Sequence, residues 1–351
     1  MAALFGRMMN RREICARVGD LTQIAGVRQY TFNSGRAKGV DAMGLHTGSS
    51  SFTLLPSRCL DIADASFCGM PYGYISKSGI RAPQYFVEDG DKGFLDNFFG
   101  GLLTTSGLGN IGSSGEDRGK RYGMHGQLSN IPADETSVST IWEEDECVFR
   151  VQASMRHSRF YGEDLLFCRK IEARLGENRI FLEDSVENQD FSPAVNMLLY
   201  HINFGYPLVD ENTEFITSPV LRTQPRTSKA AEGMNEYRKL SAPVPDYEEE
   251  CFYHWFETGN DGLAYAALYN PDLDFSAYLI YRPAELPYFV QWKMMRAKEY
   301  VFGFAPCNSL CEGRSDARKK GLLPEILPFE SKTYRLELGA VEGRFHPENH
   351  R

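Results

Sequence analysis

Alternation of apolar and polar residues limits the folds available to this chain more than any other feature. It runs through residues 149–156, 171–175, 180–187 and 334–338, in which apolar residues recur at every second position except 184. A period of two places these residues on one face of a strand, so each segment predicts a strand with one buried face. The turn residues 176–178 (GEN) separate two of the segments and predict an antiparallel hairpin.

Signals for helices are few by comparison. Residues 8–18 predict a short leading helix, and residues 315–320, stopped by Gly321, predict one or two helical turns. We expect the polar stretch 223–245 and the acidic run 248–250 to be solvated loops. Many strands and few helices in 351 residues predict an all-β fold built as a large antiparallel sandwich.

Composition excludes several classes of protein. Hydrophobic residues make up 42% and charged residues 24%, as in globular proteins generally, and the formal net charge of -9 argues against nucleic-acid binding. No apolar run is long enough to span a bilayer, and the arginines at 7, 11 and 12 follow the first apolar residues, which is the wrong order for a secretory signal. We therefore expect a cytoplasmic protein that does not bind membranes.

The eight cysteines are scattered, without a C-x-x-C pair. This spacing favours buried free thiols over a disulfide framework or zinc ligands. Cys307 and Cys311 are close in sequence, but no histidine lies at ligand spacing from them, so we predict no metal site.

Two histidines lie in distinctive short frames. His125 belongs to residues 121–126 (RYGMHG), and His201 belongs to residues 198–208 (LLYHINFGYPL). Imidazole changes charge near neutral pH, so two of them in one cleft would serve to move protons onto and off a ligand. Structural roles are the alternatives: His125 as a turn residue, and His201 as a core histidine that follows an apolar run.

Four further segments combine glycine, aromatic and ionisable residues: 55–62, 98–108, 291–295 and 303–314. Glycine lets the backbone approach a ligand closely, and Trp292 offers an apolar face for a sugar ring. An internal ion pair is an equally good explanation for Arg58 and Asp61. Lys293 lies in an apolar stretch, where a buried ammonium needs a carboxylate or a ligand as partner.

Taken together, these segments resemble the aldose 1-epimerase (galactose mutarotase-like) superfamily, and in particular its less characterised aldose-1-epimerase-like branch. The order and spacing of residues 58–62, 100–108, 125–126, 200–208 and 303–308 carry the resemblance, which extends over nearly the whole chain. It implies a β-supersandwich with an open sugar-binding cleft. The whole chain, 1–351, would form one domain, with a leading segment 1–20 and a tail 340–351.

The resemblance also implies a mechanism without metal or organic cofactor. A histidine protonates the ring oxygen of a cyclic sugar while a carboxylate takes the proton of the anomeric hydroxyl, and the ring opens and recloses. By position, His201 is the proton donor and His125 binds near the ring oxygen. The expected substrate-binding residues are Arg58, Asp61, Tyr200, Asn203, Gln291, Lys293, Asn308 and Glu312.

One position departs from the family pattern. Ala305 stands where the resemblance implies the catalytic glutamate, and a methyl group accepts no proton. The chain is then an engineered or disabled variant, a binding protein on an enzyme fold, or an enzyme that uses another carboxylate such as Glu312 or Asp61. Without any base we expect a rate loss of about 10²–10⁴.

Two classes of function therefore stay open. The first is an isomerase that interconverts sugar anomers, or a related isomerase or lyase acting on a ketose or a glycoside derivative. The second is a carbohydrate-binding or regulatory protein without turnover. Either would act on a small carbohydrate, and the exposed edges of large sheets make a homodimer reasonable.

Overall fold

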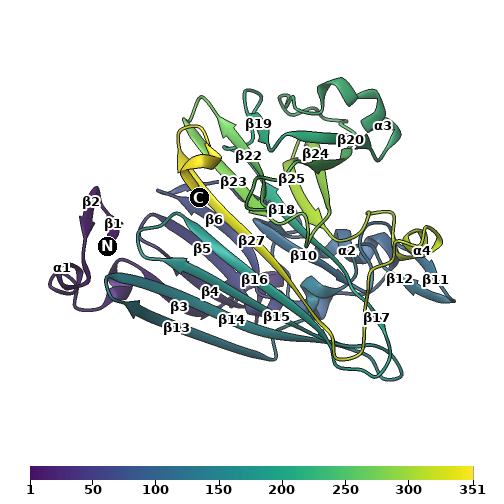
Figure 1. Cartoon of the computed structure of the whole chain (residues 1–351), viewed down its shortest axis with the longest axis horizontal. Coiled ribbons are helices and arrows are strands. Elements are labelled where there is room, and N and C mark those ends of the chain that lie inside the picture. Colours follow the sequence, from purple (N-terminus) through teal and green to yellow (C-terminus); the bar gives the residue numbers. More distant parts are fainter. Residues whose placement is uncertain (351) are drawn as a thin grey trace.

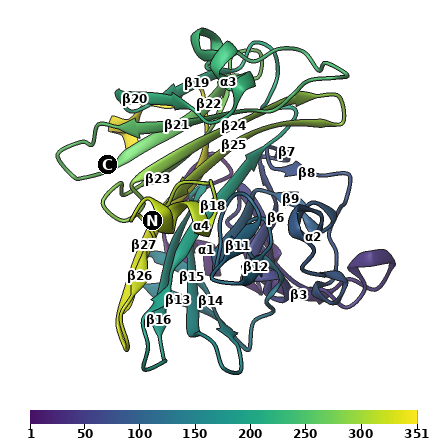
Figure 2. The same ribbon diagram turned by 90° about the vertical axis from the view of Figure 1, so that its right-hand side faces the viewer.

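Two large antiparallel sheets dominate the computed structural model, which describes residues 1–350 (Figures 1 and 2). The first, which we call sheet one, has eleven strands. In spatial order they are β20 (Val220–Pro225), β21 (Glu250–Phe256), β24 (Tyr288–Arg296), β25 (Glu299–Cys307), β18 (Met197–Phe204), β10 (Leu103–Leu108), β6 (Asp61–Phe67), β5 (Ser50–Leu55), β4 (Asp41–His46) and β3 (Gly26–Thr31), with β7 (Met70–Pro71) beside β6.

Sheet two has eight strands. Their order is β13 (Glu135–Glu143), β14 (Glu146–Ser158), β15 (Asp164–Arg174), β16 (Arg179–Asn188), β27 (Ser331–Glu342), β23 (Phe275–Tyr281), β22 (Ala264–Asn270) and β19 (Glu214–Thr217). The sandwich and the few short helices confirm the predicted all-β fold.

Short elements complete the fold. The two-stranded sheets are β1 (Ala2–Leu4) with β2 (Arg7–Met9), β8 (Tyr74–Ile75) with β9 (Gly100–Gly101), β11 (Gly115–Asp117) with β12 (Lys120–Tyr122), and β17 (Ala194–Val195) with β26 (Glu325–Ile326). The α-helices are α1 (Arg11–Cys15), α2 (Gly90–Asn97), α3 (Ser228–Glu232) and α4 (Arg314–Lys319). In Figure 1, α2, α4 and the β11–β12 hairpin lie at the right-hand end of the molecule.

Several local predictions can be compared with these elements. The predicted hairpin is β15–β16, and α1 and α4 lie within or close to the two predicted helical segments. The expected loop 223–245 contains α3, and Glu250 of the acidic run is buried in β21, where Lys293 neutralises it at 3.4 Å. Part of the expected tail is also ordered, since β27 extends to Glu342 and Phe345 is buried. Residue 351 lies outside the described part of the chain.

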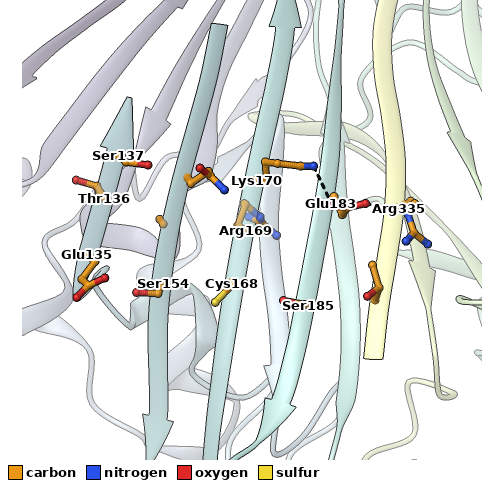
Figure 3. Close-up of a pocket in the computed structure, with 13 residues that line it drawn as sticks. Glu135, Thr136, Ser137, Ser154, Cys168, Arg169, Lys170, Glu183, Ser185 and Arg335 are labelled. Carbon is orange, nitrogen blue, oxygen red and sulfur yellow. Dashed lines mark hydrogen bonds and ion pairs between the residues drawn. The ribbon is translucent and has the colours of Figure 1, made fainter. Parts of the chain in front are cut away.

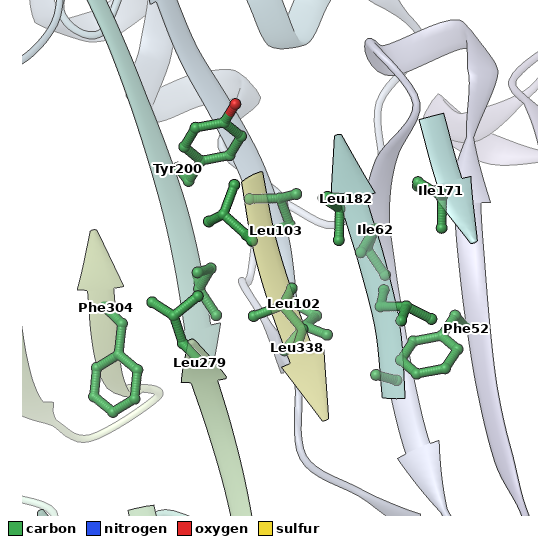
Figure 4. Close-up of a cluster of buried hydrophobic side chains, with 14 of the residues drawn as sticks. Phe52, Ile62, Leu102, Leu103, Ile171, Leu182, Tyr200, Leu279, Phe304 and Leu338 are labelled. Carbon is green, nitrogen blue, oxygen red and sulfur yellow. The ribbon is translucent and has the colours of Figure 1, made fainter. Parts of the chain in front are cut away.

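Alternation explains both faces of sheet two. Its outer face carries a row of polar side chains across β14, β15, β16 and β27, with Lys170 and Glu183 paired at 2.9 Å (Figure 3). Its inner face is apolar and packs on the inner face of sheet one, so that Ile171 and Leu338 meet residues such as Ile62 and Phe304 (Figure 4). Removal of this apolar surface from water is the main force that holds the sheets together.

A buried ion network joins the two sheets inside this core. Arg169 of sheet two donates to Asp184 at 2.6 Å and to Asp61 of sheet one at 3.1 Å. Thr105 hydrogen-bonds Asp61, and the Tyr200 hydroxyl donates to Asp184 at 2.8 Å. Burial raises the pKa of Asp61, while the nearby Arg169 cation opposes that shift. The cation therefore compensates two carboxylates that the apolar core would otherwise destabilise.

We predict that Arg169→Leu lowers the free energy of unfolding by about 3–5 kcal/mol, because it leaves Asp61 and Asp184 buried without their cation. Urea denaturation measures this. The control, Arg150→Leu, breaks the partly exposed Arg150–Glu172 pair on the outer face and should cost about 1 kcal/mol or less. Equal losses in the two variants would contradict a special role of the buried network.

Candidate active site

The two histidines meet on the face of sheet one that points away from the core. His201 lies in β18 between Tyr200 and Ile202, whose side chains point into the core, so alternation turns its ring outward. His125 lies in the loop after β12. The ring centroids are 5.8 Å apart, with the planes at 74°. The structure thus brings together the two side chains that the sequence singled out.

The His125-Gly126 pair of the frame 121–126 has a geometric cause. His125 has a positive φ of 57°, and its carbonyl accepts a hydrogen bond from Gly107 of β10. Gly126 follows with φ of 66°, and a Cβ there would lie 2.4 Å from the Gly107 carbonyl oxygen. A side chain at position 126 would therefore push the histidine loop away from β10.

A backbone contact sets the orientation of the His125 ring. The Gly112 amide donates to His125 Nδ1 at 3.3 Å. A nitrogen that accepts carries no proton, so the neutral ring holds its proton on Nε2. Gly112 also forms a β-bridge with Glu312, which brings that residue close to His125.

Aromatic rings surround the pair. Trp292 of β24 packs against His201 at 5.1 Å, Phe98 packs against His201 at 5.3 Å, and Phe94 of α2 packs against His125 at 4.7 Å. Gly303 makes room for the tryptophan, since a Cβ there would lie 3.2 Å from Trp292 and 3.5 Å from the His201 ring. The cavity beside His125 is only about 10 Å³, enough for about one water molecule.

Burial keeps both imidazoles uncharged. It lowers the pKa of His201 to about 4, although the Asn203 side chain acts in the opposite direction. Burial also lowers the pKa of His125 well below its usual value, and the neighbouring His201 and Arg226 add to the effect. At neutral pH the site therefore holds a pair of neutral rings.

Ala305 lies opposite one member of this pair, on the same face of sheet one. Leu199 pairs with Cys307 and Ile202 with Phe304, so the register of β18 and β25 sets Ala305 opposite His201. Ala305 is nevertheless buried in an apolar cluster that includes Ile111 and Cys311. The position where the family resemblance implies a carboxylate is filled by hydrocarbon and thiol groups.

A carboxylate does lie nearby, on the loop after β25. Glu312 accepts a hydrogen bond from the Tyr253 hydroxyl at 2.8 Å and lies 3.4 Å from Arg226 Nε. Tyr253 belongs to the same cross-strand row as Val290 and Ala305. Glu312 therefore lies on the same side of sheet one as Ala305.

Other predicted residues have their polar atoms in use elsewhere. The Arg58 guanidinium donates to the carbonyl groups of Ser129, Arg81 and Asn97, and Asn308 binds the backbone of Leu198. Asp61 and Tyr200 belong to the core network described above, with almost no exposed surface. A substrate role for these four stays a prediction without geometric support.

Register explains the positions of Gln291 and Lys293. Trp292 faces the histidines, so its two neighbours in β24 face the opposite side of the sheet. There Gln291 bonds His254 at 2.9 Å, and Lys293 bonds Glu250 at 3.4 Å. The structure does not bring either residue to the histidine pair. Asn203 does lie there, but its amide donates to the backbone carbonyl of His201 at 2.8 Å, which suits positioning of that residue.

Sequence reasoning missed Arg226, Tyr253 and Phe94, whereas Phe98 lay in the candidate segment 98–108. Arg226 lay within the stretch that we expected to be a solvated loop. Only its position next to β21, with its amide bonded to the Cys251 carbonyl, shows that it belongs to the site. Alternation along β21 could have indicated Tyr253, had its pairing with β24 been known.

The described residues were also compared with the requirements of a metal site and of a membrane-spanning helix. Within the described residues, no group of three or more His, Cys, Asp or Glu side chains is placed to hold a metal ion. None of the described helices has the length and apolar character needed to cross a membrane.

Known proteins resemble this chain in their sequence family and in their fold. The family described as "Domain of unknown function (DUF4432)" matches residues 37–340. This chain belongs to that family. Comparison with curated proteins gives no significant match.

Solved structures show the wider fold. A protein from Klebsiella pneumoniae, named provisionally as an aldose 1-epimerase, superposes with a TM-score of 0.86 at 22% identity, over 90% of this chain and 83% of the other. A galactose mutarotase-like protein from Clostridium acetobutylicum gives 0.63 at 14% identity, over 91% and 99%. Galactose 1-epimerase from Lactobacillus acidophilus gives 0.60 at 12% identity, over 91% and 100%. This DUF4432 chain therefore has the galactose mutarotase-like fold, which confirms the predicted resemblance at the level of the fold.

We predict that the histidine site makes stability depend on pH. Because the pKa of His201 is about 4 in the folded chain and about 6.5 when unfolded, protonation favours unfolding. This contribution to stability is complete above about pH 6.5 and is lost as the pH falls toward 4. In His201→Gln, the difference in unfolding free energy between pH 7.5 and pH 5 should shrink by about 2 kcal/mol. An unchanged difference, measured by urea denaturation, would show that His201 titrates normally.

Proposed function

We propose that this DUF4432 protein catalyses the reversible opening of a cyclic hemiacetal sugar. The carrying observation is the pair of imidazoles, 5.8 Å apart and beside Trp292, on the outer face of sheet one. The names of the similar structures, aldose 1-epimerase and galactose mutarotase-like protein, support the same class of substrate. The tryptophan ring offers an apolar surface for the sugar, and the imidazoles offer proton transfer at the ring oxygen.

In the proposed reaction His201 donates a proton to the ring oxygen, and His125 holds that oxygen through Nε2–H. A carboxylate takes the proton of the anomeric hydroxyl while the bond between the anomeric carbon and the ring oxygen breaks. The aldehyde group rotates about its bond to the neighbouring carbon, and the reverse steps close the ring on the other face of that group. Because both proton transfers are reversed, no proton is gained or lost overall. We assign the carboxylate to Glu312.

The low pKa of His201 has a consequence for this scheme. At pH 7 only a small fraction of His201 is imidazolium, because its pKa is about 4. Only the imidazolium form of His201 donates the proton, and its fraction increases as the pH falls toward the pKa. The turnover should therefore rise as the pH falls from 7 toward 5.

We predict that Glu312→Gln slows anomer exchange by about 10²–10⁴, because a general base contributes about that factor. Magnetisation-transfer NMR at the anomeric carbon, with a panel of aldoses, measures the rate. The control is Glu249→Gln, which removes the exposed carboxylate that accepts from Trp292 Nε1 at 2.8 Å and should change the rate by only a few fold. Unchanged exchange in Glu312→Gln would remove that residue from the mechanism.

A second candidate function is carbohydrate binding without turnover. The observation that favours it is that position 305 carries a methyl group, buried among Ile111 and Cys311, and no carboxylate. On this account the histidines and Trp292 would bind a sugar through hydrogen bonds and packing only.

Ala305→Glu separates the two candidates. If the protein is an enzyme of low activity, the new carboxylate lies opposite His201, raises its pKa and should accelerate anomer exchange. Calorimetry on the same samples measures sugar binding. Binding without exchange in both the natural chain and the variant would favour the binding protein, and neither binding nor exchange with any aldose would reject both candidates.

A further inference from the structure

A second cavity, lined by none of the histidines or the aromatic rings around them, combines an exposed aromatic ring with charged side chains. Its volume is about 560 Å³, within the range of small-molecule binding sites. Tyr161, Asp190, Arg118, Arg314, Arg318 and Glu325 are among the residues that line it. We call it the tyrosine cavity.

Tyr161 is held in an exposed position by its own turn. It lies at the tip of the β14–β15 hairpin with φ of 57°, and the Gly162 amide bonds the Arg159 carbonyl to close the turn. Its side chain is 91% exposed, and the neighbouring Phe160 ring packs against it with centroids 4.3 Å apart. The two adjacent exposed rings therefore present an aromatic surface at the edge of the cavity.

The opposite wall is formed by oriented arginines of α4. Asp117 accepts from Arg314 Nε at 2.8 Å and from Arg318 Nε and Nη2 at 2.8 and 2.9 Å. The side chains of Arg314 and Arg318 are 15% and 24% exposed, so the ion pairs hold them partly buried at the cavity wall. Arginine held in this way offers donors in a fixed direction.

The charges of the cavity favour a neutral ligand. Three arginines line it, but Asp117 already binds two of them, and the carboxylates of Glu163, Asp190 and Glu325 also line the cavity. An anion would gain little from such balanced charges. Donors and acceptors of both kinds beside an aromatic ring suit a molecule with many hydroxyl groups and apolar ring faces.

We propose that the tyrosine cavity binds a neutral oligosaccharide, with one sugar ring on Tyr161 and its hydroxyl groups on the charged wall. The size of the cavity exceeds that needed for a single small ring, so an oligosaccharide fits better than a monosaccharide. The proposal is independent of turnover at the histidine pair, because none of the lining residues belongs to that site.

Calorimetry with four linear hexasaccharides (of glucose in α- and in β-linkage, of xylose, and of mannose) tests this. All variants are made in the His201→Gln background, so that turnover cannot contribute to the signal. We expect at least one hexasaccharide to bind. Tyr161→Ala should weaken that binding by roughly tenfold, equivalent to about 1.4 kcal/mol.

The matched control is Phe329→Ala, which removes another exposed aromatic ring that does not line the cavity. It should leave the affinity within about twofold of the parent, a change of well under 1 kcal/mol. Circular dichroism checks that both variants fold. The proposal is overturned if none of the four sugars binds, or if the two alanine variants have equal effects. A wild-type dimer in sedimentation that Tyr161→Ala dissociates would also overturn it, since the ring would then serve contact between copies.

Discussion

The alternation of side chains along β18 is the constraint on which the rest of the structure depends. Tyr200 points into the core and donates to Asp184, which Arg169 connects to Asp61 of the same sheet as β18. His201, the next residue, points out of the sandwich toward His125 and Trp292. One strand therefore fixes the sheet packing on one face and the candidate site on the other. Displacement of β18 by one residue would turn the imidazole into the core between the sheets and the tyrosine out of it.

Ala305 and the histidines belong to one electrostatic arrangement. A carboxylate opposite His201 would stabilise its imidazolium form, but an apolar cluster occupies that place and burial lowers the pKa of His201 to about 4. Glu312, on the loop that covers Ala305, carries the negative charge instead and lies against Arg226. The site combines neutral rings with a displaced carboxylate, which distinguishes it from the arrangement that the family resemblance implies.

Those features of the fold and the site that depend on local sequence pattern could be predicted from the sequence. Period-two alternation was enough for β14 and for the β15–β16 hairpin, and the two histidine frames predicted side chains that do meet. It could not predict the partners of Arg58, because carbonyl groups of residues 81, 97 and 129 reach that side chain only in the folded chain. The sequence also could not predict on which face of the sheet Gln291 and Lys293 lie. β24 has large residues on both faces, and only its pairing with β25 and the ring contact with His201 show that Trp292 faces the histidines.

The most direct test of the account observes the imidazole nitrogens themselves. Long-range ¹H–¹⁵N NMR at pH 7 should show neutral rings for His125 and His201, with His125 protonated at Nε2, and both signals should shift when a sugar binds. Charged rings at that pH, or signals of both histidines that stay unchanged with a sugar shown to bind, would contradict the claim that this neutral pair forms the carbohydrate site.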